Sequence, residues 1–199
     1  MSARASIIPV FVPHLGCPHA CVFCNQRRIS GAVTPATAED VKNSIEKAAA
    51  FLPKRGKRQL AFYGGSFTAI PTWEQEALLG AAKEALDRGE IDAIRLSTRP
   101  DAIDDAVLDR LRRYGVETVE LGAQSMEDEV LRLAGRGHTA ADVERAAKLV
   151  KAAGFQLILL PIRQKGGIGI HARKGRSGLR TGLQNGDGFQ PSRHRAKKR

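Results

Sequence analysis

Five strand-like apolar segments alternate with helix-like segments between residues 7 and 161, and this alternation limits the possible folds more than any other feature. The strand-like segments are IIPVFV (7–12), RQLAFYGG (58–65), IDAIRLST (91–98), VETVELGAQS (116–125) and FQLILLP (155–161). Segments with apolar residues at helical spacing lie between them, at 38–52, 72–89, 104–115, 126–135 and 139–154. Strands and helices that alternate through short connections predict an α/β fold with a parallel sheet. A partial barrel and an open doubly wound sheet both fit this pattern.

Several residues predict where the helices begin or end. Thr37 is the expected N-cap of the first helical segment, because its hydroxyl can accept from a free backbone amide. Thr72 is the expected N-cap of the second, with Gln75 three positions on and Gly89 as its stop. His138 precedes the last helical segment, where a capping role is favoured over a catalytic one.

Polar and glycine-containing stretches directly follow the predicted strands. They are the cysteine-containing segment after 7–12, Gly64–Gly65, Ser97–Thr98 and Gln124–Ser125. Because the strands of a parallel sheet end at the same edge, we expect these four stretches to converge in space. Ligands of parallel α/β folds bind at that edge, so the sequence predicts the functional site there.

All three cysteines, Cys17, Cys21 and Cys24, lie in the stretch GCPHACVFCNQRRISG (16–31). Thiolates clustered in this way most often bind zinc or an iron–sulfur cluster. No second CxxC occurs in the sequence, so a four-ligand zinc site would need His14 or His19, and that alternative stays open. An odd number of cysteines at one place argues against a disulfide framework and indicates a reducing, cytoplasmic compartment.

The net charge of +11 is concentrated at the end of the sequence. Residues 161–199 contain eleven Lys or Arg residues and one acid, Asp187, whereas residues 1–160 are close to neutral. The segment 161–199 is rich in glycine and has no periodicity, so we expect a disordered basic tail after a 1–160 domain. Such a tail is a solvated end or an aberrant reading frame, or alternatively it binds RNA phosphates. No apolar run approaches the ~20 residues that span a bilayer, so no membrane partner is expected.

The spacing CxxxCxxC, with the aromatic Phe23 before the last cysteine, resembles the radical S-adenosylmethionine (SAM) superfamily. The resemblance implies that Cys17, Cys21 and Cys24 ligate three irons of a [4Fe–4S] cluster. The fourth iron is then chelated by the amino and carboxylate groups of SAM. One electron from the cluster would cleave SAM to a 5′-deoxyadenosyl radical, which abstracts a hydrogen atom.

The same resemblance assigns further residues to cofactor binding, mostly at strand ends. They are Phe23, Gly64, Gly65, Ser66, Ser97, Thr98, Gln124 and Arg136. Gly64 and Gly65 stand in the superfamily's GGE motif, with Ser66 in place of the glutamate, and exposed backbone carbonyls there are expected to accept from the SAM ammonium. The Ser97 and Thr98 hydroxyls are expected near the ribose. Gln124 is expected to hydrogen-bond SAM, and Arg136 to pair with its carboxylate.

Without the resemblance, each of these features has an ordinary structural interpretation. The glycine pair fits a turn, Ser97 and Thr98 fit a helix-entry turn, Gln124 fits a buried amide, and Arg136 fits a surface arginine.

The match narrows to one branch of the superfamily. PHLGCPHACVFCNQRRISG, YGGSFTAIP, STRPDAID and ELGAQSMEDEVLRLAGRGHT look like the branch that contains the elongator catalytic subunit and short bacterial relatives. Those relatives are often labelled oxygen-independent coproporphyrinogen oxidase-like. The resemblance covers about residues 5 to 160 and implies a six-stranded partial TIM-type barrel, (β/α)6. It also implies a reductant such as flavodoxin or ferredoxin, and tRNA or another nucleotide as the substrate.

The sequence departs from that branch after FQLIL, where a glycine- and arginine-rich stretch replaces the expected sixth βα unit. We therefore expect an incomplete barrel of about five βα units, truncated or frame-shifted near residue 160. An open wall would admit solvent to the cavity, so we expect cluster and SAM binding but impaired turnover. The alternative function is a non-enzymatic zinc- or cluster-binding module whose basic tail holds RNA. The sequence assigns no catalytic residue.

Overall fold

The computed structural model describes residues 5–12, 21, 34–52 and 56–161. These residues belong to one compact unit, Met1–Gly169. The predictions for Cys17, Phe23 and Cys24, and for nearly all of the basic segment 161–199, lie outside the described residues. The domain boundary near residue 160 and the expected disorder after it therefore stay predictions.

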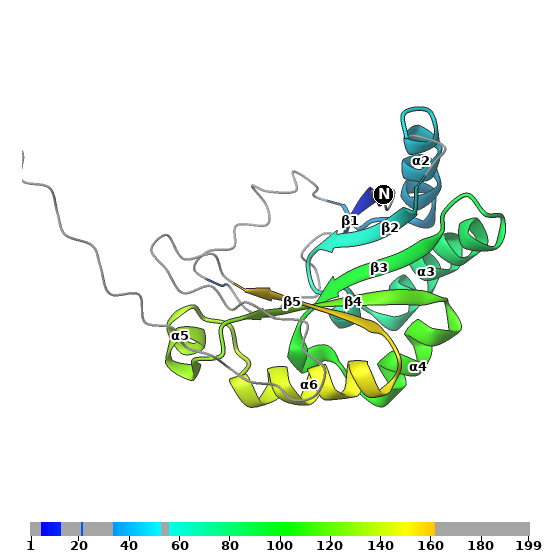
Figure 1. Ribbon diagram of the computed structural model, residues 1–199. Coiled ribbons are helices and arrows are strands. Elements are labelled where there is room, and N and C mark those ends of the chain that lie inside the picture. Colours follow the sequence, from blue (N-terminus) through cyan, green and yellow to red (C-terminus); the bar gives the residue numbers. More distant parts are fainter. Residues whose placement is uncertain (1–4, 13–20, 22–33, 53–55, 162–199) are drawn as a thin grey trace, which may run out of the picture. The chain divides into compact units, whose positions relative to one another are not determined.

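The described chain forms a five-stranded parallel sheet (Figure 1). Its strands are β1 (Ser6–Val12), β2 (Arg58–Gly64), β3 (Ala93–Thr98), β4 (Val116–Gln124) and β5 (Gln156–Pro161). The spatial order is β1-β2-β3-β4-β5, so each new strand is added on the same side of the one before it. A doubly wound sheet would reverse this direction at a switch point. The order therefore selects the partial barrel from the two predicted architectures.

Helices follow the strands as predicted and cover one face of the sheet (Figure 1). They are α2 (Ala38–Ala49), α3 (Thr72–Asp87), α4 (Asp105–Arg113), α5 (Asp128–Leu133) and α6 (Ala140–Ala152), with short 3-10 turns η2 (Phe67–Ala69) and η3 (Pro100–Ala102). Alternate strand residues such as Leu60, Phe62 and Leu96 are fully buried between sheet and helices. Burial of apolar side chains on this one face supplies the main driving force for the fold.

Side-chain caps explain where α2 and α6 begin. Thr37 accepts from the Asp40 amide at 3.2 Å, and the Asp40 carboxylate accepts from the Thr37 amide at 2.9 Å, which confirms the predicted N-cap. The same reciprocal pair joins Thr139 and Asp142 at the start of α6, with distances of 3.2 and 2.9 Å. The expected capping role of His138 is therefore wrong, because its neighbour Thr139 performs it.

The predicted cap of α3 is also wrong. Pro71 occupies the N-cap position, and Thr72 is the first helical residue. Gln75 is buried and donates from Nε2 to the carbonyl oxygens of Thr68 and Ile70, at 3.1 and 2.8 Å. Its amide thus fixes the loop that enters the helix. The stop of α3 is confirmed, because Gly89, which follows the C-cap Arg88, has φ of +71°.

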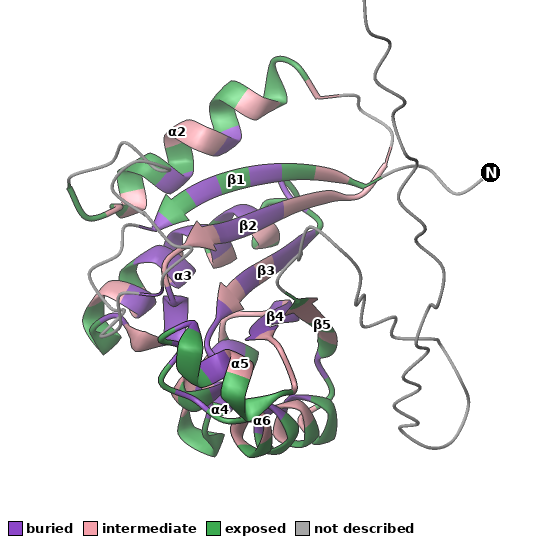
Figure 2. Cartoon of the chain, turned by 90° about the vertical axis from the view of Figure 1, so that its left-hand side faces the viewer, coloured by how far each residue is buried: buried purple, intermediate pink, exposed green. Residues whose placement is uncertain are grey.

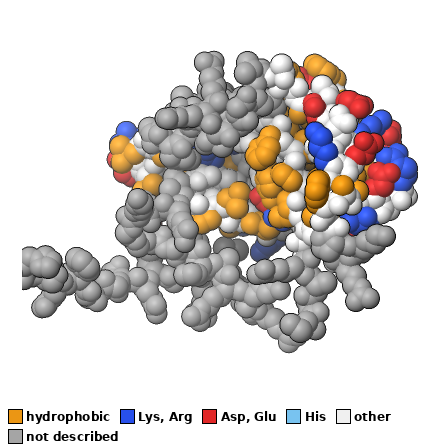
Figure 3. Space-filling view, turned by 90° about the horizontal axis from the view of Figure 1, so that it is seen from above, with side chains coloured by type: hydrophobic (Ala, Val, Ile, Leu, Met, Phe, Trp, Pro, Cys, Tyr) orange, Lys and Arg blue, Asp and Glu red, His pale blue; other side chains and the backbone are white. Residues whose placement is uncertain are grey.

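The sheet face opposite the helices carries exposed apolar residues at its first strand. Along β1 the residues alternate between buried and exposed (Figure 2). Ile7 and Phe11 are 43% and 50% exposed, and Ile158 on β5 is also exposed. Hydrophobic side chains gather on part of the surface seen from above (Figure 3). Among the described residues, no helix is long and apolar enough to cross a membrane.

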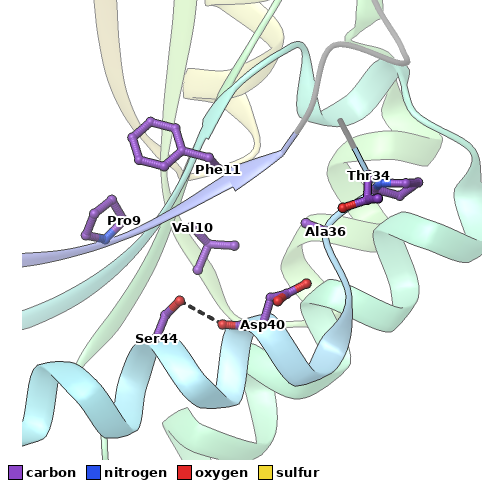
Figure 4. A pocket seen from close by; sticks show the side chains of 8 residues that line it. Pro9, Val10, Phe11, Thr34, Ala36, Asp40 and Ser44 are labelled. Carbon is purple, nitrogen blue, oxygen red and sulfur yellow. Dashed lines mark hydrogen bonds between the residues drawn. The ribbon is translucent and has the colours of Figure 1, made fainter. Parts of the chain in front are cut away.

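A small pocket lies between β1 and the start of α2 (Figure 4). Its polar groups already serve the helix, because the Ser44 hydroxyl donates to the Asp40 carbonyl at 2.7 Å and the Asp40 side chain caps α2. The remaining lining is mostly apolar, including Pro9, Val10 and Phe11. The pocket therefore presents no convergent polar groups for a ligand.

Candidate functional site

Buried hydroxyl groups join the ends of β2 and β3. Ser66 Oγ lies 2.9 Å from Thr98 Oγ1, and the Arg99 amide donates to Ser66 Oγ at 3.2 Å. Thr68 also hydrogen-bonds Thr98 Oγ1 and donates to the Ala102 carbonyl at 2.6 Å. The two predicted stretches therefore converge. The residue in the place of the GGE glutamate is tied to the neighbouring strand.

Gly64 lies against the end of β1, where the chain enters the cysteine-containing segment. Its φ is +111°, and a β-carbon there would lie 2.6 Å from the Val12 carbonyl oxygen. The Gly65 amide donates to the same carbonyl at 3.0 Å. Glycine is required at position 64 both by backbone conformation and by space. The glycine pair thus packs against Val12, the last residue of β1, at the carboxyl end of the sheet.

Arg136, between α5 and α6, contacts both Cys21 and the end of β4. Its Nη1 lies 3.4 Å from Cys21 Sγ, and its Nη2 donates to the Gly122 carbonyl at 2.8 Å. Cys21 and Arg136 are only 5% and 7% exposed. The Cys21 thiol also lies 3.6 Å from the Gly135 carbonyl oxygen. A predicted cluster ligand and a predicted SAM-binding residue therefore meet in one buried contact.

Gln124 ends β4 in a strained backbone conformation. It has φ of +66°, the one positive φ of a non-glycine residue in the described chain. The Ser125 amide donates to the Ala123 carbonyl at 2.8 Å, which closes a tight turn around Gln124. A β-carbon at Gly122 would lie 3.2 Å from both Gln124 Nε2 and Arg136 Nη2. Glycine at 122 thus leaves room for both side chains. Non-glycine residues held at positive φ are typical of ligand-binding sites.

His138 also contacts this turn, through the Ala123 carbonyl. Its Nε2 lies 3.2 Å from the Ala123 carbonyl oxygen, so Nε2 carries the proton and donates. Burial lowers the pKa of the imidazole, and the charge of Arg136 lowers it further, although the Ala123 hydrogen bond acts in the opposite direction. The neutral ring is therefore favoured. Its Nδ1 is buried and has no hydrogen-bond partner among the described residues.

A charged network that the sequence analysis missed lies on the sheet face opposite the helices. The Glu120 carboxylate is buried and pairs with Arg95. Ser97 Oγ donates to Glu120 Oε2 at 2.7 Å, and Tyr63 Oη lies 3.4 Å from Oε1. Burial raises the pKa of Tyr63, and the negative charge of Glu120 raises it further. The sequence does contain a signal for this network, because Arg95 and Glu120 are charged residues within otherwise apolar strand segments.

Two predicted positions receive different surroundings although they are adjacent in sequence. Ser97 faces the Glu120 network, whereas Thr98 faces Ser66 and Thr68 on the helix-covered side. Successive strand residues point to opposite faces, so the two hydroxyls cannot approach one ligand from the same side of β3.

Cys21 is the one predicted cluster ligand within the described residues, and its surroundings fit that role. The guanidinium of Arg136 complements the negative charge that a metal-bound thiolate carries. Thiolates are also the usual ligands of iron–sulfur clusters. Across 5–12, 21, 34–52 and 56–161, no three His, Cys, Asp or Glu side chains gather to hold a metal.

Comparison with known proteins identifies the family. Residues 11–162 match the Radical SAM superfamily. The uncharacterized protein MJ0486 of Methanocaldococcus jannaschii is 32% identical over 171 residues, covering 77% of this chain and 52% of that protein. A tRNA uridine(34) acetyltransferase of Methanocaldococcus infernus is 24% identical over 189 residues, covering 76% of this chain and 35% of that enzyme.

Solved structures agree with the fold. Archaeal Elp3 of Methanocaldococcus infernus aligns with a TM-score of 0.59 at 19% identity, over 80% of this chain and 38% of that one. The relatives also include elongator complex proteins, in agreement with the branch that the sequence resembles. The chain spans about half or less of the length of the curated relatives described above. The matched segment covers most of the sequence, and the chain belongs to the radical SAM superfamily.

Proposed function

We propose that the chain binds a [4Fe–4S] cluster through Cys17, Cys21 and Cys24 and cleaves SAM reductively. The observation that carries the proposal is the buried contact of Cys21 with Arg136 at the carboxyl end of the sheet. Family membership supports the cofactor pair. When bound, the cluster supplies the electron that cleaves SAM to a 5′-deoxyadenosyl radical.

The chain's own residues have distinct tasks in this proposal. The strand-end backbone at Gly64 and Gly65 accepts from the SAM ammonium, and Arg136 faces the SAM carboxylate. Gln124 is assigned to the same ligand, and its amide lies on the same side of Gly122 as the Arg136 guanidinium, at 3.2 Å from the position of a β-carbon there. Cys21 and Arg136 are both buried, so their contact is shielded from water.

The remaining assigned residues complete the cofactor site. Ser66 ties β2 to β3 behind the glycine pair, and Phe23 shields the cluster side. Ser97 or Thr98 is assigned to the ribose. Because these two point to opposite faces, Ser97 is the one on the open face.

The substrate and partners follow from the relatives. A tRNA-modifying relative supports tRNA or another nucleotide as the substrate. A reductant such as flavodoxin or ferredoxin would supply electrons in the cytoplasm. Residues 1–160 are close to neutral, so any binding of RNA phosphates by this chain would fall to the basic segment 161–199.

Anaerobic reconstitution with iron and sulfide tests the proposal. The full chain is expected to take up about four irons and to release 5′-deoxyadenosine from SAM after dithionite reduction. Cys21→Ser should abolish cluster binding, whereas Ser44→Ala, on the outer helix α2, should not. One zinc per chain, with no SAM cleavage, would show instead a zinc-binding module.

A further inference from the structure

Arg136 is held against Cys21 by contacts at both terminal nitrogens of its guanidinium. Nη1 lies 3.4 Å from Cys21 Sγ, and Nη2 donates to the Gly122 carbonyl at 2.8 Å. Both terminal nitrogens of the guanidinium are therefore oriented by the protein itself.

The backbone around Arg136 is fixed as firmly as its side chain. Arg99 Nη2 donates to the Arg136 carbonyl at 2.6 Å, and Asp101 in turn holds the Arg99 guanidinium at 2.9 and 3.0 Å. The Arg136 amide donates to the Leu131 carbonyl at 3.0 Å. With so little freedom at either end, the guanidinium loses little entropy in holding its position against the sulfur.

We infer that Arg136 is a hydrogen-bond donor to the Cys21 sulfur of the assembled cluster and raises the cluster's reduction potential. The inference rests on the proposed function, because it needs Cys21 to be a cluster ligand. Reduction adds one electron, and thus one negative charge, to the cluster. A buried cation and an N–H group at a ligand sulfur stabilise that charge, since hydrogen bonds to cluster sulfurs and burial set these potentials.

This role differs from binding the SAM carboxylate. A carboxylate partner acts only while SAM is present, whereas the sulfur contact acts in its absence. The midpoint potential of the SAM-free protein therefore isolates the sulfur contact. SAM affinity, measured separately, reports on the carboxylate.

The test is a redox titration of the reconstituted full chain without SAM, followed by electron paramagnetic resonance of the reduced cluster. Arg136→Met should lower the midpoint potential relative to the wild type. Arg136→Lys, which keeps the charge but loses the planar fork, should lower it less. Arg110→Met is the matched control. Its guanidinium is also largely buried, on α4, but it bonds Gln75 Oε1 at 3.1 Å and does not contact Cys21.

A second variant keeps the test decisive if Arg136→Met loses the cluster. Gly122→Ala places a β-carbon 3.2 Å from both Arg136 Nη2 and Gln124 Nε2, so the guanidinium must shift by a few tenths of an ångström while its charge is kept. It should also lower the midpoint potential. Equal midpoints in wild type, Arg136→Lys and Gly122→Ala would overturn the inference, as would lower cluster content with an unchanged midpoint. A wild-type chain that takes up no iron–sulfur cluster would instead contradict the proposed function and the inference with it.

Discussion

His138 shows how one buried residue at the carboxyl edge links pH to stability. Its imidazole is 4% exposed and donates to the Ala123 carbonyl. Burial holds its pKa below the ordinary value of 6.5, with the cations Arg136 and Arg99 acting in the same direction and Asp101 opposing them. Below about pH 6.5 the unfolded chain binds a proton that the folded protein rejects. The free energy of unfolding is therefore not reduced by His138 above that pH, and it decreases as pH falls further below it.

His138→Gln should remove this pH dependence, because the glutamine amide can donate to Ala123 without titrating. We expect the free energy of unfolding of the wild type to fall more between about pH 7.5 and 5.5 than that of the variant. Urea denaturation at both pH values measures the difference. The same fall in both proteins would show that His138 does not titrate in this range.

Gly64 offers a sharper test of backbone strain. A β-carbon there would lie 2.6 Å from the Val12 carbonyl oxygen, in a backbone conformation with φ of +111°. Gly64→Ala should therefore cost about 2 kcal/mol or more of unfolding free energy. Gly80→Ala is the control, because Gly80 lies in α3 with nothing within 4 Å of a β-carbon. The control should stabilise the protein by about 0.5–1 kcal/mol. Equal effects at the two positions would contradict the close approach of β1 to Gly64.

At the scale of elements, the capping pairs decide where helices begin. Thr139→Ala removes the hydroxyl that accepts from the Asp142 amide, and should cost about 1 kcal/mol. Thr72→Ala is a useful contrast, because Thr72 stands just inside α3 without a capping bond and should lose almost nothing. Thermal or urea unfolding of the two variants compares them directly. A larger loss of unfolding free energy in Thr72→Ala than in Thr139→Ala would show that Thr72 caps α3, as the sequence suggests.

The cap formed by Thr139 and Asp142 also makes the stability of the protein depend on pH under acid conditions. Hydrogen bonds from Thr139, backbone first and hydroxyl second, lower the pKa of Asp142 to about 2, with a further contribution from Arg145. The stabilisation is present above the ordinary Asp pKa of about 3.8 and is lost as pH falls toward 2. The free energy of unfolding should therefore fall less between about pH 5 and pH 2.5 in Asp142→Asn than in the wild type. An unchanged difference would contradict this lowered pKa.

Sequence periodicity predicted the order and approximate limits of the elements, because burial on one face dictates that pattern. The helix expected at 126–135 is shorter, Asp128–Leu133, since the chain must turn back for Arg136 to reach the sheet edge. The predicted cap of α3 was wrong because Gln75 lies at the spacing of a capping residue from Thr72. Its amide instead donates to the buried carbonyl of Thr68. Such long-range partners leave no trace in local spacing.

The site was predictable only in part for the same reason. Strand ends could be placed at one edge from topology alone, and Ser66 and Thr98 do meet there. The pairing of Arg95 with Glu120 depends on the register between β3 and β4, which includes a shift after Ile94. The positive φ of Gln124 accompanies a second irregularity between β4 and β5. Sequence patterns do not specify these shifts.

At the scale of the whole molecule, five strands added in one direction form an open wall. The architecture brings Gly64, Gln124, Arg136 and Cys21 to the same edge from separate parts of the chain. Helices cover one face of the sheet, and the other face carries no helix among the described residues (Figure 1). The fold therefore supports cofactor chemistry at the edge more directly than nucleic-acid binding by the nearly neutral body.

The most direct test of the account is the electron paramagnetic resonance spectrum of the reconstituted and reduced full chain, recorded before and after addition of SAM. The three proposed cysteine ligands would leave one iron for SAM, so SAM should change the signal of a [4Fe–4S] cluster and then yield 5′-deoxyadenosine. Cys21→Ser should show neither the signal nor the product. A cluster signal that is indifferent to saturating SAM, or a protein that holds only zinc, would contradict the account.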